Sequence, residues 1–226
     1  IVKPNTTLTL ENGKTLCVGG IVRIDGTVAD NGATVLMNGT SPQTTVGTGL
    51  AQFHNITIDN SAGVTINNTI KVKNHLQINA GRILTIAAND SLYLAGTYTN
   101  AGTFNKNGTV VFNGTTTQNL TGNGFTTFNH LVIANPAGVQ AFDGNVVNGN
   151  VTIRSNGNFV MPNVGTVNLK GNFINNGTYS SNDVMQLVFN GTSKQRIGGS
   201  KVTTFANLTV NNFDTVVLLS NGRVSR

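Results

Sequence analysis

The residues that could carry out acid–base chemistry are few and scattered along the chain. General acid–base catalysis needs two titratable groups held within several ångströms of each other. Asp25 and Asp30 are close in sequence, but both lie near an expected turn, and we interpret them as a solvated pair. We therefore predict no catalytic residues and no enzymatic activity. The carboxylates are Glu11, Asp25, Asp30, Asp59, Asp90, Asp143, Asp183 and Asp214.

Metal-ligating residues are equally sparse. Cys17 is the only cysteine, so no cysteine-based metal site is expected. Of the three histidines, His54 and His130 occupy adjacent repeat positions that would lie roughly 19 Å apart along stacked strands, too far to share a metal. His75 stands alone. We predict neither a metal site nor a cofactor.

Most of the chain follows a long sequence repeat. The Asn-Gly-Thr triplets that begin at Asn38, Asn113 and Asn190 recur at spacings of 75 and 77 along the chain. Each triplet is followed by a glutamine and then by a phenylalanine at matching positions. Self-similarity at this period is typical of stacked supersecondary units. We predict a structural repeat ladder of nine residues: Asn38, Asn113, Asn190, Gln43, Gln118, Gln195, Phe53, Phe128 and Phe205.

The repeat also suggests the domain organisation. Residues 1–30 match the end of a repeat, residues 31–105 and 106–181 form two full repeats, and residues 182–226 begin a third. We interpret residues 1–226 as one continuous domain.

A shorter period runs within each repeat. Apolar residues alternate with polar ones, as in Leu76-Gln-Ile78, which is the pattern of a half-buried strand. Asn-Gly and Ala-Gly pairs, which favour turns, separate these short segments. The expected strand centres follow one another at intervals of 18 to 20 and are Val18, Leu36, Ile56, Leu76, Leu94, Phe112, Leu131, Val151, Leu169, Phe189 and Leu208.

These spacings predict an all-β parallel β-helix, or β-solenoid. We expect a right-handed winding, about 19 residues per turn and four turns per 75–77-residue repeat. A β-sandwich is the main rival fold, but it gives no reason for the long period.

The amino-acid composition argues against two kinds of partner, nucleic acid and the interior of a membrane. Only 10% of residues are charged, and the net charge of +6 is spread without a Lys/Arg run or interleaved aromatics, so no nucleic-acid partner is expected. No apolar run approaches the roughly 20 residues of a membrane-spanning helix, so no membrane span is expected in this segment.

The segments Phe112–Gln118 and Thr126–Val139, with their counterparts at Gln43–Val64 and Phe189–Val216, carry a resemblance. They resemble repeats of large secreted surface proteins and adhesins of Bacteroidota and, more distantly, adhesin stalks of the filamentous-haemagglutinin type. The resemblance implies an extracellular or cell-surface location.

We therefore expect a non-catalytic structural module of a secreted bacterial surface protein, as the shaft of an adhesin or the subunit of an extracellular filament. Expected partners are further copies bound end to end, or neighbouring segments of one long chain, with glycans or another cell surface as further partners. The alternative is a β-helix that binds carbohydrate or processes polysaccharide, with Tyr93, Tyr98 and Tyr179 in contact with sugar.

Overall fold

The structure, a computed structural model, describes residues 1–49, 51–119, 121–122, 127–141, 144–161, 165–181 and 184–224. These residues form strands and turns and contain no helix. The strand pairings of the described residues are parallel, as in β4 with β1 and β24 with β21. The predicted all-β parallel β-solenoid is therefore confirmed. The chain divides into two compact units, Ile1–Val110 with Thr121–Gly124 (unit 1) and Val111–Leu120 with Phe125–Arg226 (unit 2).

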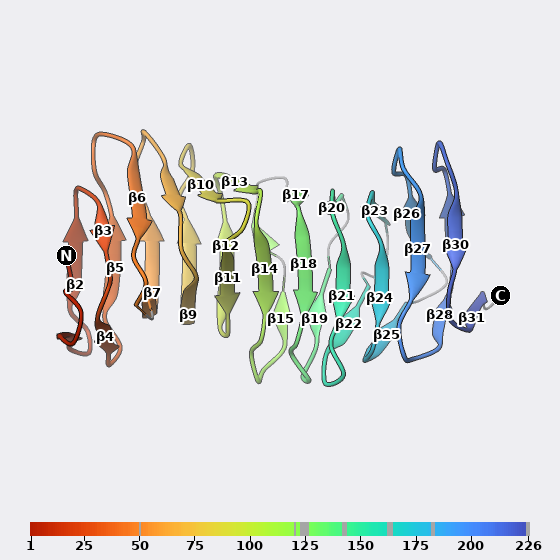
Figure 1. Cartoon of the computed structure of the whole chain (residues 1–226), viewed down its shortest axis with the longest axis horizontal. Coiled ribbons are helices and arrows are strands. Elements are labelled where there is room, and N and C mark those ends of the chain that lie inside the picture. The colour runs from red at the N-terminus through yellow and green to blue at the C-terminus, as the bar shows by residue number, and fades with distance from the viewer. Residues whose placement is uncertain are drawn as a thin grey trace. The chain divides into compact units, whose positions relative to one another are not determined.

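Short strands build unit 1, and Figure 1 labels many of them. They are β1 (Thr7–Leu10), β2 (Thr15–Val18), β3 (Val22–Arg23), β4 (Thr27–Asp30), β5 (Thr34–Met37), β6 (Gln43–Val46), β7 (Ala51–Ile58), β8 (Val64–Ile66), β9 (Ile70–Ile78), β10 (Ile83–Ile86), β11 (Ser91–Leu94), β12 (Thr97–Asn100), β13 (Thr103–Lys106) and β16 (Thr121–Gly122).

Unit 2 is built in the same way, and β14 (Thr109–Phe112) crosses the boundary between the units. Its other strands are β15 (Gln118–Asn119), β17 (Thr127–Phe128), β18 (His130–Ile133), β19 (Val139–Gln140), β20 (Val146–Val147), β21 (Val151–Ile153), β22 (Asn158–Val160), β23 (Gly165–Leu169), β24 (Phe173–Asn175), β25 (Thr178–Ser180), β26 (Met185–Phe189), β27 (Gln195–Gly198), β28 (Thr203–Phe205), β29 (Leu208–Val210), β30 (Val216–Leu218) and β31 (Gly222–Val224).

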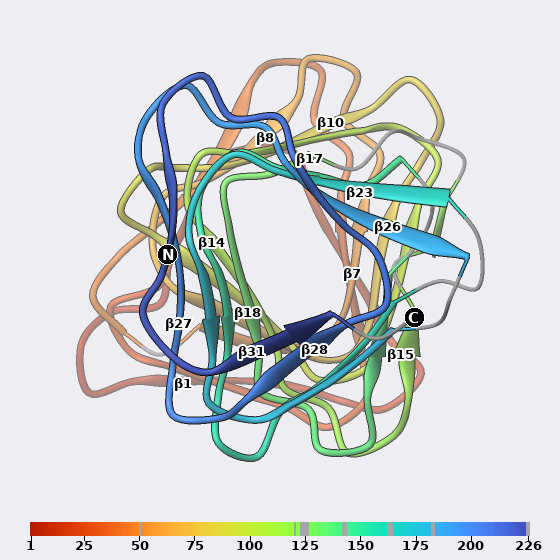
Figure 2. The ribbon, with the colours of Figure 1, turned by 90° about the vertical axis from the view of Figure 1, so that its right-hand side faces the viewer.

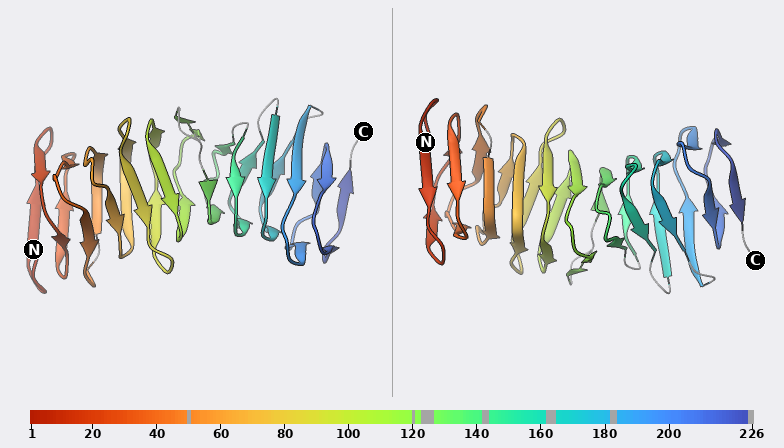
Figure 3. Two further views of the ribbon diagram at one scale, coloured as in Figure 1. Left: turned by 90° about the horizontal axis from the view of Figure 1, so that it is seen from above. Right: turned by 90° about the horizontal axis from the view of Figure 1, so that it is seen from below.

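Three strands make one turn. In unit 1, β4, β5 and β6 pair with β1, β2 and β3 of the preceding turn. In unit 2, β21, β22 and β23 pair with β18, β19 and β20, and then with β24, β25 and β26 of the next turn. Figure 2 shows strands of successive turns behind one another within each unit, and Figure 3 shows them side by side.

The turns are longer than the sequence pattern suggests. Paired residues are 19 apart at Cys17 and Leu36 but 24 apart at Phe173 and Ile197. In unit 2, three turns lead from Gln118 through Val139 and Phe159 to Tyr179, and the next glutamine of the repeat, Gln195, follows Tyr179 closely. The interval from Tyr179 to Gln195 is shorter than any of these turns, so a repeat holds fewer than the four turns expected.

Apolar side chains fill the interior because they alternate along each strand. In β18 the exposure alternates between half-buried and buried, with Leu131 and Ile133 facing inward. Glycines allow the chain to turn tightly at the corners. Gly47 and Gly199 have φ values of +126° and +118°, and a Cβ there would lie 2.0 Å from the Ile24 carbonyl oxygen and 2.1 Å from that of Asn175. Only glycine fits both the conformation and the space.

Candidate functional surfaces

The three glutamines of the repeat lie in the interior, each at most 3% exposed. In every copy the glutamine Oε1 accepts the backbone N–H of the glycine in the preceding triplet at 2.9 Å. Nε2 of Gln43 donates to the carbonyls of Val18 and Gly20 at 2.7 and 3.0 Å. Nε2 of Gln195 does the same to Leu169 and Gly171 at 2.9 and 2.5 Å. These carbonyls lie one turn earlier, so both glutamines tie their turn to the preceding one.

An asparagine at a constant distance in sequence, 17 positions after the glutamine, completes each network. Its Nδ2 donates to the glutamine Oε1 and to a backbone carbonyl of the same turn as the glutamine, and its Oδ1 accepts the backbone N–H two residues further on. These asparagines are not among the residues predicted for the ladder, although their constant spacing from the glutamines is visible in the sequence. They are Asn60, Asn135 and Asn212.

The asparagines predicted for the ladder lie elsewhere. Asn38 and Asn113 are exposed in the turn. Asn190 is half-buried, and its Nδ2 donates to Oδ1 of Asn168 at 3.0 Å. The triplets therefore place their glycine amides in the network and leave two of the three asparagine side chains in solvent.

The three phenylalanines predicted for the ladder are buried. Phe128 packs edge-on against Phe112 with ring centroids 6.2 Å apart, and Phe205 lies 5.6 Å from Tyr179. Phe53 lies inside unit 1 on β7. All three contribute to the apolar interior.

Successive copies within unit 2 lie on different sheets. Gln118 belongs to the sheet β15-β19-β22-β25, whereas Gln195 lies in β27, between β24 and β30. Phe128 and Phe205 are likewise on different sheets. These copies do not stack on one another, and each bonds instead to its own neighbouring turns.

Asp30 is not the solvated residue that we expected. It is buried, and its Oδ1 accepts the N–H groups of Gly32 and Ala33 at 3.0 and 2.8 Å. Its Oδ2 accepts the N–H of His54 at 2.7 Å. The carboxylate is buried because three backbone donors compensate for its lost hydration.

Asp25 and Asp59 form partly buried ion pairs. Asp25 pairs with Arg23 at 2.6 Å, and Asp59 with Arg82 at 3.0 Å. The hydrogen bond from Arg23 lowers the pKa of Asp25. Hydrogen bonds from Asn79 and then Arg82 lower the pKa of Asp59. Both therefore remain ionised at neutral pH. Asp143 and Asp183 lie outside the described residues.

The histidines also have structural contacts. Nδ1 of His130 accepts the N–H of Asn150 at 3.1 Å, and His75 contacts the hydroxyl of Thr97. Within the described part of the chain, no three His, Cys, Asp or Glu residues gather as a metal site would require.

The tyrosines do not form an exposed platform for sugar. Tyr98 is buried beside Phe104, with ring centroids 5.7 Å apart. Tyr179 contacts the rings of Phe159 and Phe173, and burial raises its pKa. Tyr93 is half-buried, with Lys71 Nζ 5.8 Å from the centroid of its ring. The expected role of Tyr98 in sugar contact is therefore wrong.

A polar hollow of about 440 Å³ opens in unit 1 where the turns pass from one strand to the next. Asn68 in its wall is 7% exposed; its Oδ1 accepts the Thr45 hydroxyl at 2.7 Å, and its Nδ2 has no partner among the described residues. The hollow presents hydroxyl, amide and backbone groups together with one carboxylate, and these groups can form hydrogen bonds with a polar ligand. Its lining consists of Gly47, Thr48, Gly49, Asn67, Asn68, Thr69 and Asp90.

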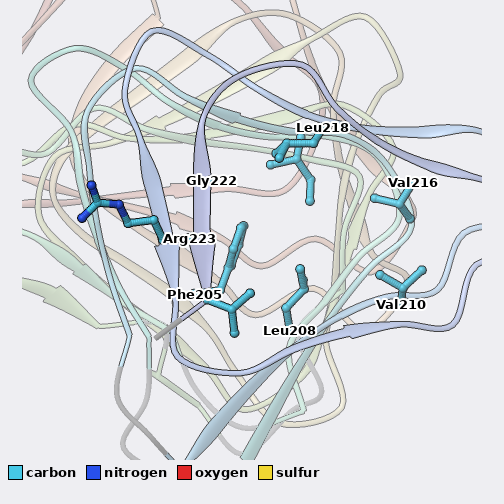
Figure 4. Close-up of a pocket in the computed structure, with 9 residues that line it drawn as sticks. Phe205, Leu208, Val210, Val216, Leu218, Gly222 and Arg223 are labelled. Atoms are coloured by element: carbon cyan, nitrogen blue, oxygen red, sulfur yellow. The ribbon is translucent and has the colours of Figure 1, made fainter. Parts of the chain in front are cut away.

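An apolar pocket of about 240 Å³ opens at the last turn of unit 2. Figure 4 shows Phe205, Leu208 and Val210 on one side and Leu218 across from them, with Arg223 pointing away. The pocket is the open end of the interior of unit 2.

Comparison with protein-family models, curated proteins and solved structures gives no match for this chain. Within the described residues, no helix is long and apolar enough to cross a membrane.

Proposed function

We propose that this chain is a non-catalytic structural module of a secreted bacterial surface protein, the shaft of an adhesin or the subunit of an extracellular filament. The observation that carries the proposal is the glutamine–asparagine network, built three times with the same glycine and asparagine bonds. Its polar groups bond to one another and to backbone groups of adjacent turns, and amides do not titrate in the physiological range. Polar side chains arranged in this way stabilise turns and do not transfer protons.

The fold suits a load-bearing role. Each turn is joined to the next by parallel strand ladders on three faces, for example β21, β22 and β23 on β18, β19 and β20. Separating two turns would break these ladders together with the glutamine bonds to the preceding turn. Local opening is therefore costly, and such regions resist proteases that require an opened chain.

The proposed location is the cell surface or the extracellular space, and the proposed partners are further copies or neighbouring segments of a longer chain, with glycans or another cell surface as further partners. Labelling of intact cells with antibodies against residues 1–226 tests the location. Signal on intact cells is expected; signal only after permeabilisation would contradict it.

Limited proteolysis of the purified chain tests the structural role. We expect digestion at least tenfold slower than for Gln118→Leu, which breaks one network, and equal to that of Gln140→Leu, which changes an exposed glutamine in the next turn. A native chain digested as quickly as Gln118→Leu would remove the support for a structural module.

A second candidate function, carbohydrate binding, is favoured by the polar hollow in unit 1. Its hydroxyl, amide and carboxylate groups match the hydrogen-bonding groups of a sugar. Glycan-array binding that is lost in Asp90→Ala and kept in Glu11→Ala, an exposed acid outside the hollow, would support this function. Equal binding by both variants, or none by the native chain, would argue against it.

A further inference from the structure

The last turn of unit 2 presents apolar side chains that nothing in the described structure covers. Val210 is 56% exposed, Leu218 54% and Val224 61%, and they border the pocket of Figure 4. They lie on β29, β30 and β31, each the outermost strand of its sheet in the described chain. Outermost strands offer unpaired backbone groups to another chain.

Two interior turns have the same layout as this last turn. The inward valines Val210, Val216 and Val224 follow one another at intervals of 6 and 8. The same intervals connect three buried residues in unit 1 and three in unit 2. These are Ile58, Val64 and Val72, and Ile133, Val139 and Val147.

Each of these interior turns is covered by a turn with a different layout. In unit 1, Ile78, Leu84 and Leu94 pair with Ile58, Val64 and Val72. In unit 2, Ile153, Phe159 and Leu169 pair with Ile133, Val139 and Val147. In both covering turns the inward residues follow one another at intervals of 6 and 10, and all are buried.

The first turn of the chain has the layout of a covering turn. Its inward residues Val2, Leu8 and Val18 also follow one another at intervals of 6 and 10. Val2 pairs with Ile24, Leu8 with Val28 and Val18 with Met37 on their other side. Among the described residues, β1 and β2 are the outermost strands of their sheets and Val2 bridges only to Ile24, so the other side of each is open to pairing.

We propose that the last turn of one copy docks onto the first turn of a second copy, with Val210, Val216 and Val224 paired to Val2, Leu8 and Val18. One register serves all three faces, because intervals of 6 and 8 on the last turn would meet intervals of 6 and 10 on the first turn, as they do in the interior pairs of both units. This inference rests on the proposed structural function and specifies its partner.

Disulfide cross-linking tests the register. One chain carries Val217→Cys and a second carries Thr9→Cys, both with Cys17→Ser to remove the native thiol. Val217 and Thr9 follow Val216 and Leu8, so they would face each other at about 4.8 Å, within the range that a disulfide spans. Thr7→Cys is the matched control, because it lies on the same side of the strand but two residues out of register.

Oxidation of the Val217→Cys and Thr9→Cys mixture should give a covalent dimer on a non-reducing gel, at least tenfold more than the Thr7→Cys mixture gives. Equal yields from both mixtures, or no dimer from either, would overturn the docking register.

Sedimentation velocity of the unmodified chain and of Leu218→Lys provides the second test. Because Leu218 is exposed in the isolated chain, its substitution leaves the fold intact, and association should weaken about a hundredfold. A chain that stays monomeric at millimolar concentration would overturn the docking. Surface labelling and protease resistance would be unchanged by that result, so the failure of the docking is distinguishable from that of the structural function.

Discussion

Two columns of inward residues, one in each unit, have the same register and different side chains. The unit 1 column runs from Gln43 through Val64 and Leu84 to Phe104. The unit 2 column runs from Gln118 through Val139 and Phe159 to Tyr179. Successive members are 21, 20 and 20 apart in both.

The polar start of the two columns is the same, whereas the apolar end varies. Both glutamines accept from a glycine amide and from the network asparagine of the following turn. Leu84 and Phe104 in one column correspond to Phe159 and Tyr179 in the other. Hydrogen bonds need fixed atoms at fixed distances, whereas apolar stacking needs only suitable volume. The glutamine–asparagine network therefore determines the turn conformation and the strand register. The stacked apolar residues tolerate exchange for other apolar residues.

Removing the glutamine tests the shared part of the columns and should have the largest effect. Gln43→Leu and Gln118→Leu each leave a buried glycine N–H and an asparagine Nδ2 without their acceptor, at about 1–3 kcal/mol per group. We expect each variant to lose about 3–5 kcal/mol of local stability. Hydrogen exchange at β8 and β19 measures the loss in each unit separately.

The exposed Gln140, one residue after Val139, provides the control for these variants. Gln140→Leu should change stability by about 0.5 kcal/mol or less. A difference above about 2 kcal/mol between Gln43→Leu and Gln118→Leu would show that the two networks are not equivalent.

Substitution of the network asparagines compares the two networks inside the solenoid with the network at the last turn. Asn60 and Asn135 are fully buried, whereas Asn212 is half-buried. Asn60→Ala and Asn135→Ala should each cost about 2 kcal/mol, because the glutamine Oε1 and a corner N–H lose a partner that water cannot replace. Asn212→Ala should cost less than about 1 kcal/mol, because Asn212 is half-buried and water can take the place of its amide beside Gln195. Equal losses of stability in all three variants, measured by hydrogen exchange, would show that burial of the asparagine does not determine the cost of removing it.

The strand alternation and turn residues were sufficient to predict the fold class, but not the length of a turn. The sequence pattern predicts that Leu76 and Leu94, and likewise Val151 and Leu169, are neighbours on successive turns. In the structure Leu76 pairs instead with Tyr98, and Val151 with Phe173, so that each partner lies four positions further along the chain than expected. Both choices are apolar, because every face carries an apolar residue within a few positions, so hydrophobic spacing alone could not decide between them.

The polar residues were harder to predict for a related reason. Asp30, Asn60 and Asn135 are buried and form hydrogen bonds with backbone groups of other turns, which no local pattern encodes. Their polarity indicates solvent, and only the long-range pairing compensates for burial. The glutamines are predictable because they follow the repeated triplets closely, whereas their asparagine partners lie in the next turn, 17 positions further along the chain.

Exchanging the variable part of the columns should have a smaller effect. Phe159→Leu gives unit 2 the residue that unit 1 has at Leu84, and removes a ring whose centroid is 6.3 Å from that of Tyr179. We expect a loss of about 1 kcal/mol, measured by exchange at β22, because the stack can partly collapse around leucine. A loss as large as that of Gln118→Leu would contradict the view that the stack tolerates exchange.

The smallest effect at neutral pH is expected where the columns end, in Tyr179 of unit 2 and Phe104 of unit 1. Burial raises the pKa of the Tyr179 phenol above its ordinary value of 10.0, and the hydrogen bond with Ser181 opposes this only in part. A raised pKa in the folded state means that the neutral phenol favours folding. This contribution is complete below pH 10 and is lost as the pH rises above it towards the folded-state pKa.

Tyr179→Phe isolates that contribution. At pH 7 the variant should match the native chain to within about 0.5 kcal/mol. Above pH 10, unit 2 of the native chain should lose stability more steeply than unit 2 of the variant, because phenylalanine has no proton to release. Circular dichroism melts between pH 9 and 11 on both chains measure the difference, with hydrogen exchange at β13, which contains Phe104, as the internal control. If both chains lose stability in parallel, the Tyr179 phenol is as easily ionised in the fold as in the unfolded chain, and its ring contacts with Phe159, Phe173 and Phe205 do not exclude water from its hydroxyl.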